Sequence, residues 1–492
     1  MLALHPPGAL IDAAACALAQ LAARMLQRLP ARSSTPSKPA VLGLVGPGHN
    51  GEDTLGCLRR LSRNGWLCTS LQGLEPTTLG TLDSHLPDTG LVIDGWLGLG
   101  RNRPLSAALS AAIARLSVWR AASPESRQIL AVDLPSGLDP DGGVGDPIAV
   151  AANTTLALLA PARGLFSPCG RAHAGKVFVA PLVGLRPRQL DHRLIRDPQA
   201  FRDLQLAKRP VHVHKGMLGE VVLVGGSKGT DGAIALAAAG ALALSPGKVH
   251  VVSPSDRLRL PMQVMHRSLE WYQQQSGRTT SSPAIPSRQV IGIGCGLGED
   301  ESAQNLLDRA LESGQDLVLD ADALNLLARN KALLKKRVFR HAQGAKSTIP
   351  TPRTVLTPHP LEAARLLDLS RDAVERDRHA AACALARQSE AVVLLKGAGT
   401  LIASPEGDCD IVDLAAPALA QAGSGDVLCG VVCALLALHP SLPAHRLAAA
   451  AALLHAEAAR RWSQRTGQVA GLSMDTLAQE VSGVFAEFDR DD

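Results

Sequence analysis

Aromatic side chains are scarce in this sequence, which holds one Tyr, six Phe and five Trp among 492 residues. Proteins that bind single-stranded nucleic acid commonly stack the bases on aromatic side chains, so the composition does not favour such a platform. Basic residues exceed acidic ones only slightly, with 50 Lys and Arg against 45 Asp and Glu. A broad basic surface for a polyanion is therefore not expected, and we predict no nucleic-acid partner.

Paired cysteines and long apolar runs are also missing. The nine cysteines are scattered without a C-x-x-C pair, a pattern typical of reduced thiols and not of a disulfide framework or a zinc motif. The apolar runs at residues 233–244 and 427–438 are shorter than the ~18 residues that suggest a membrane span. The first residues lack the basic segment and apolar core of a secretory signal. We therefore expect a cytoplasmic protein with no membrane partner.

Apolar material is abundant, since hydrophobic residues make up 46% of the chain and charged residues 19%, and most of the chain should be folded. Aliphatic runs alternate with Ala/Leu-rich stretches along the whole length, a pattern typical of parallel sheets covered by helices on both faces. We therefore predict an α/β protein with two doubly wound domains. The predicted strands are residues 41–45, 91–94, 129–133, 176–180, 220–224, 249–253, 290–293, 317–320, 354–357 and 392–395.

The predicted domain junction lies in a segment rich in Arg, Pro and His, residues 184–215, which shows no sustained period. Such charge-rich segments are usually solvated connectors. We place the first domain at residues 1–186, the connector at 187–208 and the second domain at 209–492. A polar, Pro-containing segment at residues 272–287 is expected to be an exposed loop.

The most specific local motif is QAGSGDVLCG, residues 421–430, in which a Gly-Ser-Gly turn leads directly into an apolar helix. The free backbone N–H groups and the dipole of a helix start favour a bound phosphate. Asp426 lies in the same turn and has two interpretations. It could simply be a favourable charge at a helix N-terminus, or it could be the base for a substrate hydroxyl that attacks a phosphoryl group.

Further glycine-rich or polar clusters follow other predicted strands of the second domain. LLKGAGT places Lys396 and a Gly-Ala-Gly turn at a strand end, and LTPHPLE places His359 at another. GIGCGLG and LDADALN, the latter with Asp320 and Asp322, follow two more strands. Ligands bind at the carboxyl ends of strands in open α/β sheets, so these clusters together predict one site. Read without its neighbours, His359 could equally be a capping or structural histidine.

The first domain has three comparable loops. Residues 41–61 read as strand, glycine turn and helix, an arrangement that binds phosphate groups. Two further strands end at Asp94 and Asp133. If the loops meet, Asn50, Asp94 and Ser136 supply oxygen ligands suited to a hard cation, and Asp133 could act as a base. Alternatively, the two aspartates could only end their strands and Ser136 could only shape a turn.

The second-domain motifs, in their order from HKGMLGEVVLVGGS to GSGDVLCG, resemble the ribokinase-like ADP-dependent NAD(P)H-hydrate dehydratase. The resemblance implies a ribokinase-like fold and the use of ADP with Mg²⁺ to dehydrate (S)-NAD(P)H hydrate, with release of AMP and phosphate. It implies a nucleotide site formed by Lys396, Gly397, Ala398, Gly399, Thr400 and Gly425. It also implies contacts to the hydrated nicotinamide from Ala233, Gly296, His359 and the catalytic Asp426.

The first-domain loops resemble the NAD(P)H-hydrate epimerase, the usual N-terminal partner of that dehydratase, with a Rossmann-like fold. The resemblance implies a potassium ion held by Asn50, Asp94 and Ser136, and a catalytic Asp133. The epimerase would then interconvert the R and S hydrates of NADH and NADPH. The residues implied to contact this substrate are His49, Asn50, Gly51, Glu52, Asp53, Gly98, Leu99, Gly100, Arg101, Asn102, Arg103, Pro104 and Asp133.

This sequence departs from the family pattern at several positions. Glu52 and Thr54 stand where the epimerase loop has glycines, which removes backbone freedom and adds a negative charge near the expected phosphate. Cys295 stands in place of Pro and is expected to be a small buried hydrophobe. Leu361 replaces a glycine and could narrow the substrate site, and Ala416 replaces an asparagine.

An alternative function stays open from the sequence alone. A ribokinase-like kinase for a small hydroxymethyl compound or vitamin precursor would use the same helix start and the same Asp426. The first domain would then bind a nucleotide or a partner without catalysis. The sequence leaves a homo-oligomer open in either case.

Overall fold

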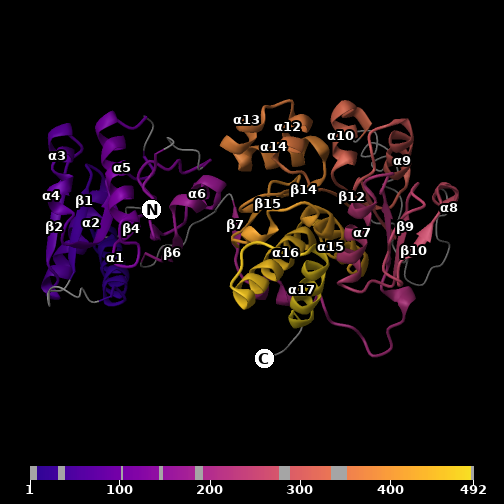
Figure 1. Cartoon of the computed structure of the whole chain (residues 1–492), viewed down its shortest axis with the longest axis horizontal. Helices are drawn as coiled ribbons and strands as arrows, with labels where there is room; N and C mark the ends of the chain where they lie inside the picture. Colours follow the sequence, from indigo (N-terminus) through magenta and orange to yellow (C-terminus); the bar gives the residue numbers. More distant parts are fainter. Residues whose placement is uncertain are drawn as a thin grey trace. The chain divides into compact units, whose positions relative to one another are not determined.

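The computed structural model describes residues 8–30, 39–100, 104–142, 148–182, 192–275, 289–333 and 352–488 (Figure 1). The chain forms two compact units, Met1–Leu190 and Asp191–Asp492. Each unit contains one sheet with helices on both faces, which confirms the predicted α/β class.

The first unit is built on a six-stranded parallel sheet with the order β2-β1-β3-β4-β5-β6. The strand order reverses between β1 and β3, and ligands bind beside such a switch point in doubly wound folds. All residues of β1 and β3 are buried, as strands covered on both faces must be. The strands are β1 (Ala40–Val45), β2 (Cys68–Gln72), β3 (Thr89–Gly95), β4 (Gln128–Val132), β5 (Thr154–Leu158) and β6 (Lys176–Ala180).

Helices α1 and α2 cover one face of this sheet, and α3, α4 and α5 pack against the other, so that two separate apolar cores form. The helices are α1 (Ala9–Gln27), α2 (His49–Arg63), α3 (Pro76–Gly80), α4 (Leu82–His85), α5 (Ala107–Ala121), η2 (Arg163–Phe166) and α6 (Pro168–His173). Among the described residues, α1 alone is long and apolar enough to cross a membrane. This helix precedes the glycine loop after β1, and its Leu18 and Ala22 are buried in a core with residues of α2 and β3.

The second unit contains a ten-stranded sheet with the order β10-β9-β8-β11-β12-β13-β14-β15-β16-β7. Its pairs are parallel, except that β15 runs antiparallel to both β14 and β16. The strands are β7 (Arg193–Ile195), β8 (Glu220–Val224), β9 (Lys248–Val252), β10 (Met265–Arg267), β11 (Gln289–Ile293), β12 (Asp316–Leu319), β13 (Thr354–Leu356), β14 (Val392–Leu395), β15 (Thr400–Ala403) and β16 (Cys409–Val412).

The helices of the second unit divide between the two faces of this sheet. Helices α7, α15, α16 and α17 pack together on one face, and α12, α13 and α14 lie on the other (Figure 1). The bounds are η3 (Pro198–Leu204), η4 (Lys215–Met217), α7 (Asp231–Leu242), α8 (Leu269–Gln275), α9 (Glu301–Glu312), α10 (Asp322–Arg329), α12 (Pro360–Leu367), α13 (Arg371–Arg376), α14 (Arg378–Ser389), η5 (Pro417–Leu419), α15 (Ser424–Leu438), α16 (Ala444–Thr466) and α17 (Met474–Glu487).

Sequence patterning found the ten predicted strands but not β2, β5, β7, β10, β15 and β16. Strand β2 is half-exposed with mixed polarity, β5 begins with two threonines, and β7, β10, β15 and β16 have only three or four residues, so no long apolar run marks any of them. Part of the predicted connector, residues 193–204, forms β7 and η3 in the second unit. Tyr272, assigned to an exposed loop, is buried, while residues 276–287 lie outside the described part.

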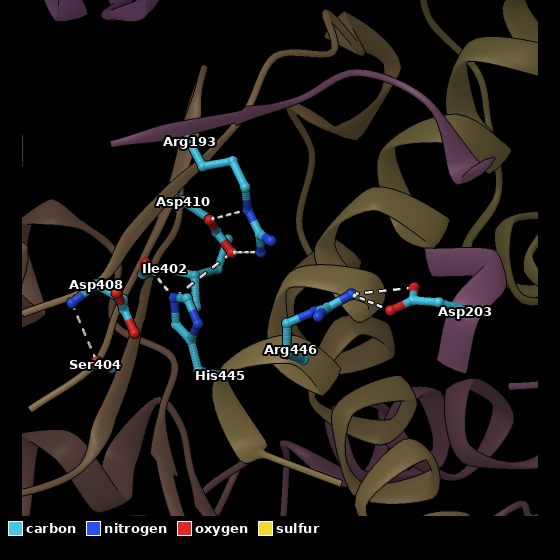
Figure 2. Close-up of polar contacts among 8 residues, drawn as sticks. All are labelled: Arg193, Asp203, Ile402, Ser404, Asp408, Asp410, His445 and Arg446. Atoms are coloured by element: carbon cyan, nitrogen blue, oxygen red, sulfur yellow. Dashed lines mark hydrogen bonds and ion pairs between the residues drawn. The ribbon is translucent and has the colours of Figure 1, made fainter. Parts of the chain in front are cut away.

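Strand β7 is attached to the second unit by a buried carboxylate. The two Asp410 carboxylate oxygens accept from the Arg193 guanidinium over 2.8 and 2.7 Å, and His445 Nε2 lies 3.6 Å from the same carboxylate (Figure 2). Asp410 therefore points from β16 toward α16, which carries His445. A buried carboxylate is costly unless it is paired, so these contacts fix the edge of the sheet.

Candidate active sites

In the second unit, the loops after β8, β11, β12, β13 and β14 are joined to one another by backbone hydrogen bonds. The Gly226 N–H donates to Cys295 O over 3.0 Å, and the Lys396 N–H donates to Pro358 O over 2.8 Å. The predicted clusters thus lie together at the carboxyl edge of the sheet, as expected for a ligand site in this architecture.

Helix α15 begins at this edge. Its N-cap, Gly423, has a left-handed backbone with φ of 91°, which glycine adopts without the strain that a side chain would bring. A Cβ on Gly425 would lie 3.3 Å from Lys396 Nζ, so the lysine ammonium lies against the first turn of the helix. A positive side chain and free N–H groups therefore face the same space, and both attract an anion.

Lys396 forms an ion pair with a residue from another strand. Its Nζ lies 2.6 Å from Asp320 Oδ1, and the Asp320 side chain is 1% exposed. Burial opposes the lysine charge, but Asp320 and Glu362 outweigh this effect and raise the pKa of Lys396. The lysine therefore stays cationic and fixed in position at neutral pH.

His359 caps helix α12, as one of its two interpretations proposed. Its Nδ1 accepts from the Leu361 and Glu362 N–H groups over 3.1 and 3.3 Å, and its backbone N–H donates to Glu362 Oε2 over 2.8 Å. Burial and the nearby Lys396 lower the pKa of His359. Because Nδ1 accepts, the proton of the neutral ring is assigned to Nε2. Leu361, expected beside the site, is 41% exposed.

Asp426 is partly buried in the first turn of α15. Burial, reinforced by Asp320 and opposed by a hydrogen bond from the Cys295 thiol and by Lys396, raises the pKa of Asp426 to about 6. The carboxylate is mostly ionised at neutral pH and is a stronger base than an exposed aspartate. Cys295 is buried, as expected, and it lowers the pKa of Asp426.

The loop after β14 turns at two glycines. Gly397 and Gly399 have φ of 144° and 67°, and Thr400 Oγ1 donates to Gly397 O over 2.9 Å. Buried Arg378 from α14 donates to Lys396 O over 3.1 Å and supports the loop from below. Ala398 lies between the two glycines and is exposed.

The two other predicted nicotinamide contacts lie on neighbouring elements. Gly296 has φ of 61°, and its carbonyl accepts from Thr230 Oγ1 over 2.9 Å. Thr230 is the N-cap of α7, and Ala233 lies in the first turn of that helix. Gly296 and Ala233 are thus brought together through Thr230.

In the first unit, Asn50 joins the three predicted loops. Its side-chain Nδ2 donates to Leu97 O over 3.0 Å and to Val132 O over 2.8 Å. Both amide hydrogens are therefore used within the protein, and the amide oxygen is left to accept from a ligand or coordinate a cation.

Asp94 and Ser136 form a buried pair beside Asn50. The Asp94 carboxylate accepts from Ser136 Oγ over 2.7 Å and from Ser136 N over 2.8 Å, while Ser136 Oγ accepts from Leu97 N over 3.0 Å. Burial, opposed by these hydrogen bonds, raises the pKa of Asp94 to about 6. The two residues thus have a defined geometry, and their role as potassium ligands stays a prediction.

Two further carboxylates lie close together at this edge. Asp133 has φ of 66° and accepts from Leu158 N over 3.1 Å, and burial raises its pKa to about 6. Burial also raises the pKa of Asp53, to about 7, with His49 opposing the rise and Asp133 and Glu52 adding to it. One oxygen of Asp53 is buried without a hydrogen-bond partner. A pair of carboxyls that titrate near neutrality can both accept and donate protons.

The two replaced glycines of the first loop are accommodated without backbone strain. Both lie in helix α2, and neither Glu52 nor Thr54 has a positive φ. The Glu52 carboxylate lies 3.0 Å from His49 Nδ1 on the exposed side of the helix, while buried Thr54 donates to Asn50 O over 2.7 Å. The lost backbone freedom therefore causes no strain in this helix, and the effect of the Glu52 charge on a substrate phosphate stays a prediction.

The other implied epimerase contacts lie near the same loops. Gly51 is in the first turn of α2, and Gly98 packs against the Asn50 side chain. Leu99 is 49% exposed, and Gly100 and Pro104 are exposed as well. Residues 101–103, which include both predicted arginines and Asn102, lie outside the described residues.

Two residues of the second site, Glu362 and Arg378, were not assigned to it from the sequence, and the pairing of Asp320 was not predicted. Asp320 was noted as a strand-end carboxylate, but its pairing with Lys396 joins residues far apart in the chain. Glu362 could have been found from the H-x-x-E spacing, because a glutamate three residues after an N-cap is typical of a capping box. Arg378 carries no recognisable local signal, because its role depends on the packing of α14 beneath the loop.

The two units are α/β modules of an enzyme with two sites, each built from glycine loops and buried carboxylates at a sheet edge. Residues 221–482 match the family model of the NAD(P)H-hydrate dehydratase, and residues 69–164 match that of the YjeF-related protein N-terminus. The chain belongs to the family of bifunctional NAD(P)H-hydrate repair enzymes. It combines a dehydratase unit with a unit of the epimerase family.

Curated relatives cover most of the chain. The chain is 31% identical to the bifunctional NAD(P)H-hydrate repair enzyme of Coxiella burnetii over 466 residues, covering 89% of each chain. It is 33% identical to that of Gloeobacter violaceus over 472 residues, covering 89% of this chain and 87% of the relative. A solved Bacillus subtilis ADP/ATP-dependent NAD(P)H-hydrate dehydratase, co-crystallized with ATP/Mg²⁺, is 27% identical with a TM-score of 0.46, covering 58% and 97% of the two chains. The relatives favour the repair enzyme over the kinase alternative.

Proposed function

We propose that the second unit uses ADP to dehydrate (S)-NAD(P)H hydrate, with Asp426 as the catalytic base. The observation that carries this proposal is the position of the partly buried Asp426 carboxylate in the first turn of α15, where Lys396 also lies. A base and an anion-binding helix start in one turn can activate a hydroxyl and stabilise the phosphoryl group that it attacks.

In the proposed reaction, the oxygen of the 6-hydroxyl group attacks the β-phosphorus of ADP while Asp426 accepts the proton of that hydroxyl. The bond from that phosphorus to the bridging oxygen breaks, and AMP leaves. The new phosphate ester then eliminates phosphate, and loss of a proton from the neighbouring ring carbon restores the double bond of NAD(P)H. Lys396 and the first N–H groups of α15 stabilise the transferred phosphoryl group.

The loop from Lys396 to Thr400, with Gly425, would hold the nucleotide, and ADP would bring Mg²⁺ bound through its phosphate oxygens. His359, whose Nε2 lies 3.3 Å from Glu362 Oε1, would contact the hydrated nicotinamide beside Gly296 and Ala233. The glycine backbone of these loops lets the nucleotide approach closely, which suits a chain with few aromatic side chains.

We further propose that the first unit exchanges the R and S hydrates. Asp133 and Asp53 would supply and accept the protons that let the 6-hydroxyl leave one face of the ring and water return to the other. The burial of both residues supports this role, because it raises both pKa values toward neutrality.

A potassium ion fits the oxygen atoms beside these carboxylates. Asp94 is fully buried, and its partners among the described residues are N–H and O–H groups. Asn50 has an amide oxygen left to coordinate, and Ser136 adds a hydroxyl oxygen. Hard cations prefer such neutral and anionic oxygens, and bound potassium would supply positive charge toward a substrate phosphate.

An epimer-resolved assay tests both proposals. Wild-type protein with ADP and Mg²⁺ should restore the absorbance of NADH from the S hydrate and, more slowly, from the R hydrate. Asp133→Asn should keep the S reaction and lose at least about 10²-fold of the enzymatic R reaction. Failure to recover NADH from the S hydrate would refute the dehydratase mechanism, and equal R rates for wild type and variant would refute the role of Asp133.

The Cys295 thiol should set the pH dependence of the dehydratase. Its hydrogen bond helps keep the pKa of Asp426 from rising further. Cys295→Ala should therefore shift the acid limb of the pH profile of kcat/KM to higher pH. The shift should be only about 0.5–1 unit, because a thiol is a weak hydrogen-bond donor. Cys295→Ser keeps a donor and should stay near the wild-type profile. Superimposable acid limbs for all three proteins would contradict this role.

A further inference from the structure

A cluster of soft-metal ligands lies in the second unit outside the two sites described above. It consists of His379, Cys383 and Cys409, whose ligand atoms all lie within 4.8 Å of one another. The Cys383 sulfur is 4.0 and 3.9 Å from the two ring nitrogens of His379. Cys383 and Cys409 are 5% and 4% exposed, whereas His379 is half-buried and gives solvent a route to the cluster.

The fold brings these three side chains together from distant parts of the chain. His379 and Cys383 are four residues apart on α14, so they share one face of the helix. Helix α14 packs on β14 and β15, and Cys409 begins the neighbouring β16. The next residue, Asp410, points toward α16 (Figure 2). Because side chains alternate along a strand, Cys409 points to the opposite face, where α14 lies.

We propose that His379, Cys383 and Cys409 form a binding site for a thiophilic divalent cation of the zinc class. Two thiolates and one imidazole are preferred ligands of Zn²⁺, and three protein ligands leave a fourth tetrahedral position for water. Binding would release the protons of both thiols. The ion would join α14 to the β15–β16 hairpin. The scattered cysteine spacing in the sequence gave no sign of this site.

Two other groups of metal-ligating side chains among the described residues are less suited to hold a cation than this cluster. Cys295, Asp320 and Cys429 also lie within 4.8 Å of one another, but the Asp320 oxygen already holds the Lys396 ammonium, which repels a second cation. Cys169 and His173 on α6 have the same spacing and lie 3.7 Å apart. They belong to no three-ligand group among the described residues, so this pair provides a matched control.

The test is a titration of the reduced full-length chain with Zn²⁺ against a chromophoric chelator, repeated with Co²⁺, whose absorption reports thiolate coordination. Wild-type protein should bind one Zn²⁺ at this site and show the thiolate-to-cobalt band. Cys383→Ser and Cys409→Ser should each weaken binding by at least about 10²-fold and lower the intensity of the band to about half at saturation, because each removes one of two thiolate ligands. Cys169→Ser should bind as the wild type does.

Thiol protection keeps the test decisive if a cysteine variant folds poorly. Zn²⁺ should slow modification of two thiols in the wild type, identified by mass spectrometry as Cys383 and Cys409. His379→Ala, a change on a half-exposed helix face, should reduce affinity by about 10- to 100-fold and leave circular dichroism unchanged. Absence of Zn²⁺ binding by reduced wild type, or unchanged binding after Cys383→Ser and Cys409→Ser, would overturn the proposal.

Discussion

Replacing Asp426 with Asn should lower the rate of NADH recovery from the S hydrate by about 10³-fold, within the range that removal of a general base produces. The amide keeps the size of the side chain but cannot accept the hydroxyl proton. Lys396 and the first turn of α15 are unchanged, so ADP should bind with nearly the wild-type affinity, measured by calorimetry. The expected loss is therefore in kcat.

The same substitution should stabilise the folded protein, which separates catalysis from structure. The pKa of Asp426 is raised to about 6 from 3.8, so its ionisation destabilises the folded state as pH rises through this window. Asp426→Asn removes that cost and should increase the free energy of unfolding by about 1–2 kcal/mol at neutral pH. At a pH below both values the two proteins should have similar stability, because the wild-type carboxyl is then protonated.

Asp475→Asn is the matched control, because Asp475 is also an acidic residue in the first turn of a helix, α17. If Asp426 served only as a favourable charge at a helix N-terminus, both substitutions would cost a few tenths of a kcal/mol to about 1 kcal/mol and neither would affect turnover. Full activity of Asp426→Asn, or its destabilisation to the same extent as Asp475→Asn, would favour that simpler role.

The parts of this molecule that the sequence predicted are those encoded locally. Buried parallel strands such as β1 and β8 are apolar runs, and glycine loops mark their carboxyl ends. Doubly wound topology then places those loops at one edge without further information. This is why Gly425 and Lys396 could be assigned to one site before their contact was known.

The parts that the sequence did not predict depend on long-range packing. The Asp320 carboxylate is positioned by Lys396 from another loop, and the Cys295 thiol is held against Asp426 by the loop after β11. No local period marks such pairs. The hairpin of β15 and β16 was missed for a similar reason, since these two strands are defined by antiparallel pairing with each other and with β14.

Replacing Lys396 with Met should produce the largest combined loss of stability and binding. Asp320 is 1% exposed, and removal of one partner from a buried ion pair typically costs about 3–5 kcal/mol because the other charge is left unpaired. The same variant removes the positive charge beside α15. We expect the affinity for ADP to fall by at least about 10²-fold, as loss of a charge-assisted contact to phosphate implies, measured by calorimetry at a temperature where the variant is folded.

The double variant Lys396→Met/Asp320→Asn separates these two effects. Without the buried carboxylate, most of the lost stability should return in urea unfolding, while ADP binding should stay weak. Lys248→Met is the control for losing a lysine from a more exposed ion pair, with Glu220, and should cost no more than about 1 kcal/mol. Stability and ADP binding should change together in the single variant but separately in the double variant. If the double variant bound ADP with wild-type affinity, the role of Lys396 would be limited to neutralising Asp320. Wild-type stability of Lys396→Met would contradict the buried pair itself.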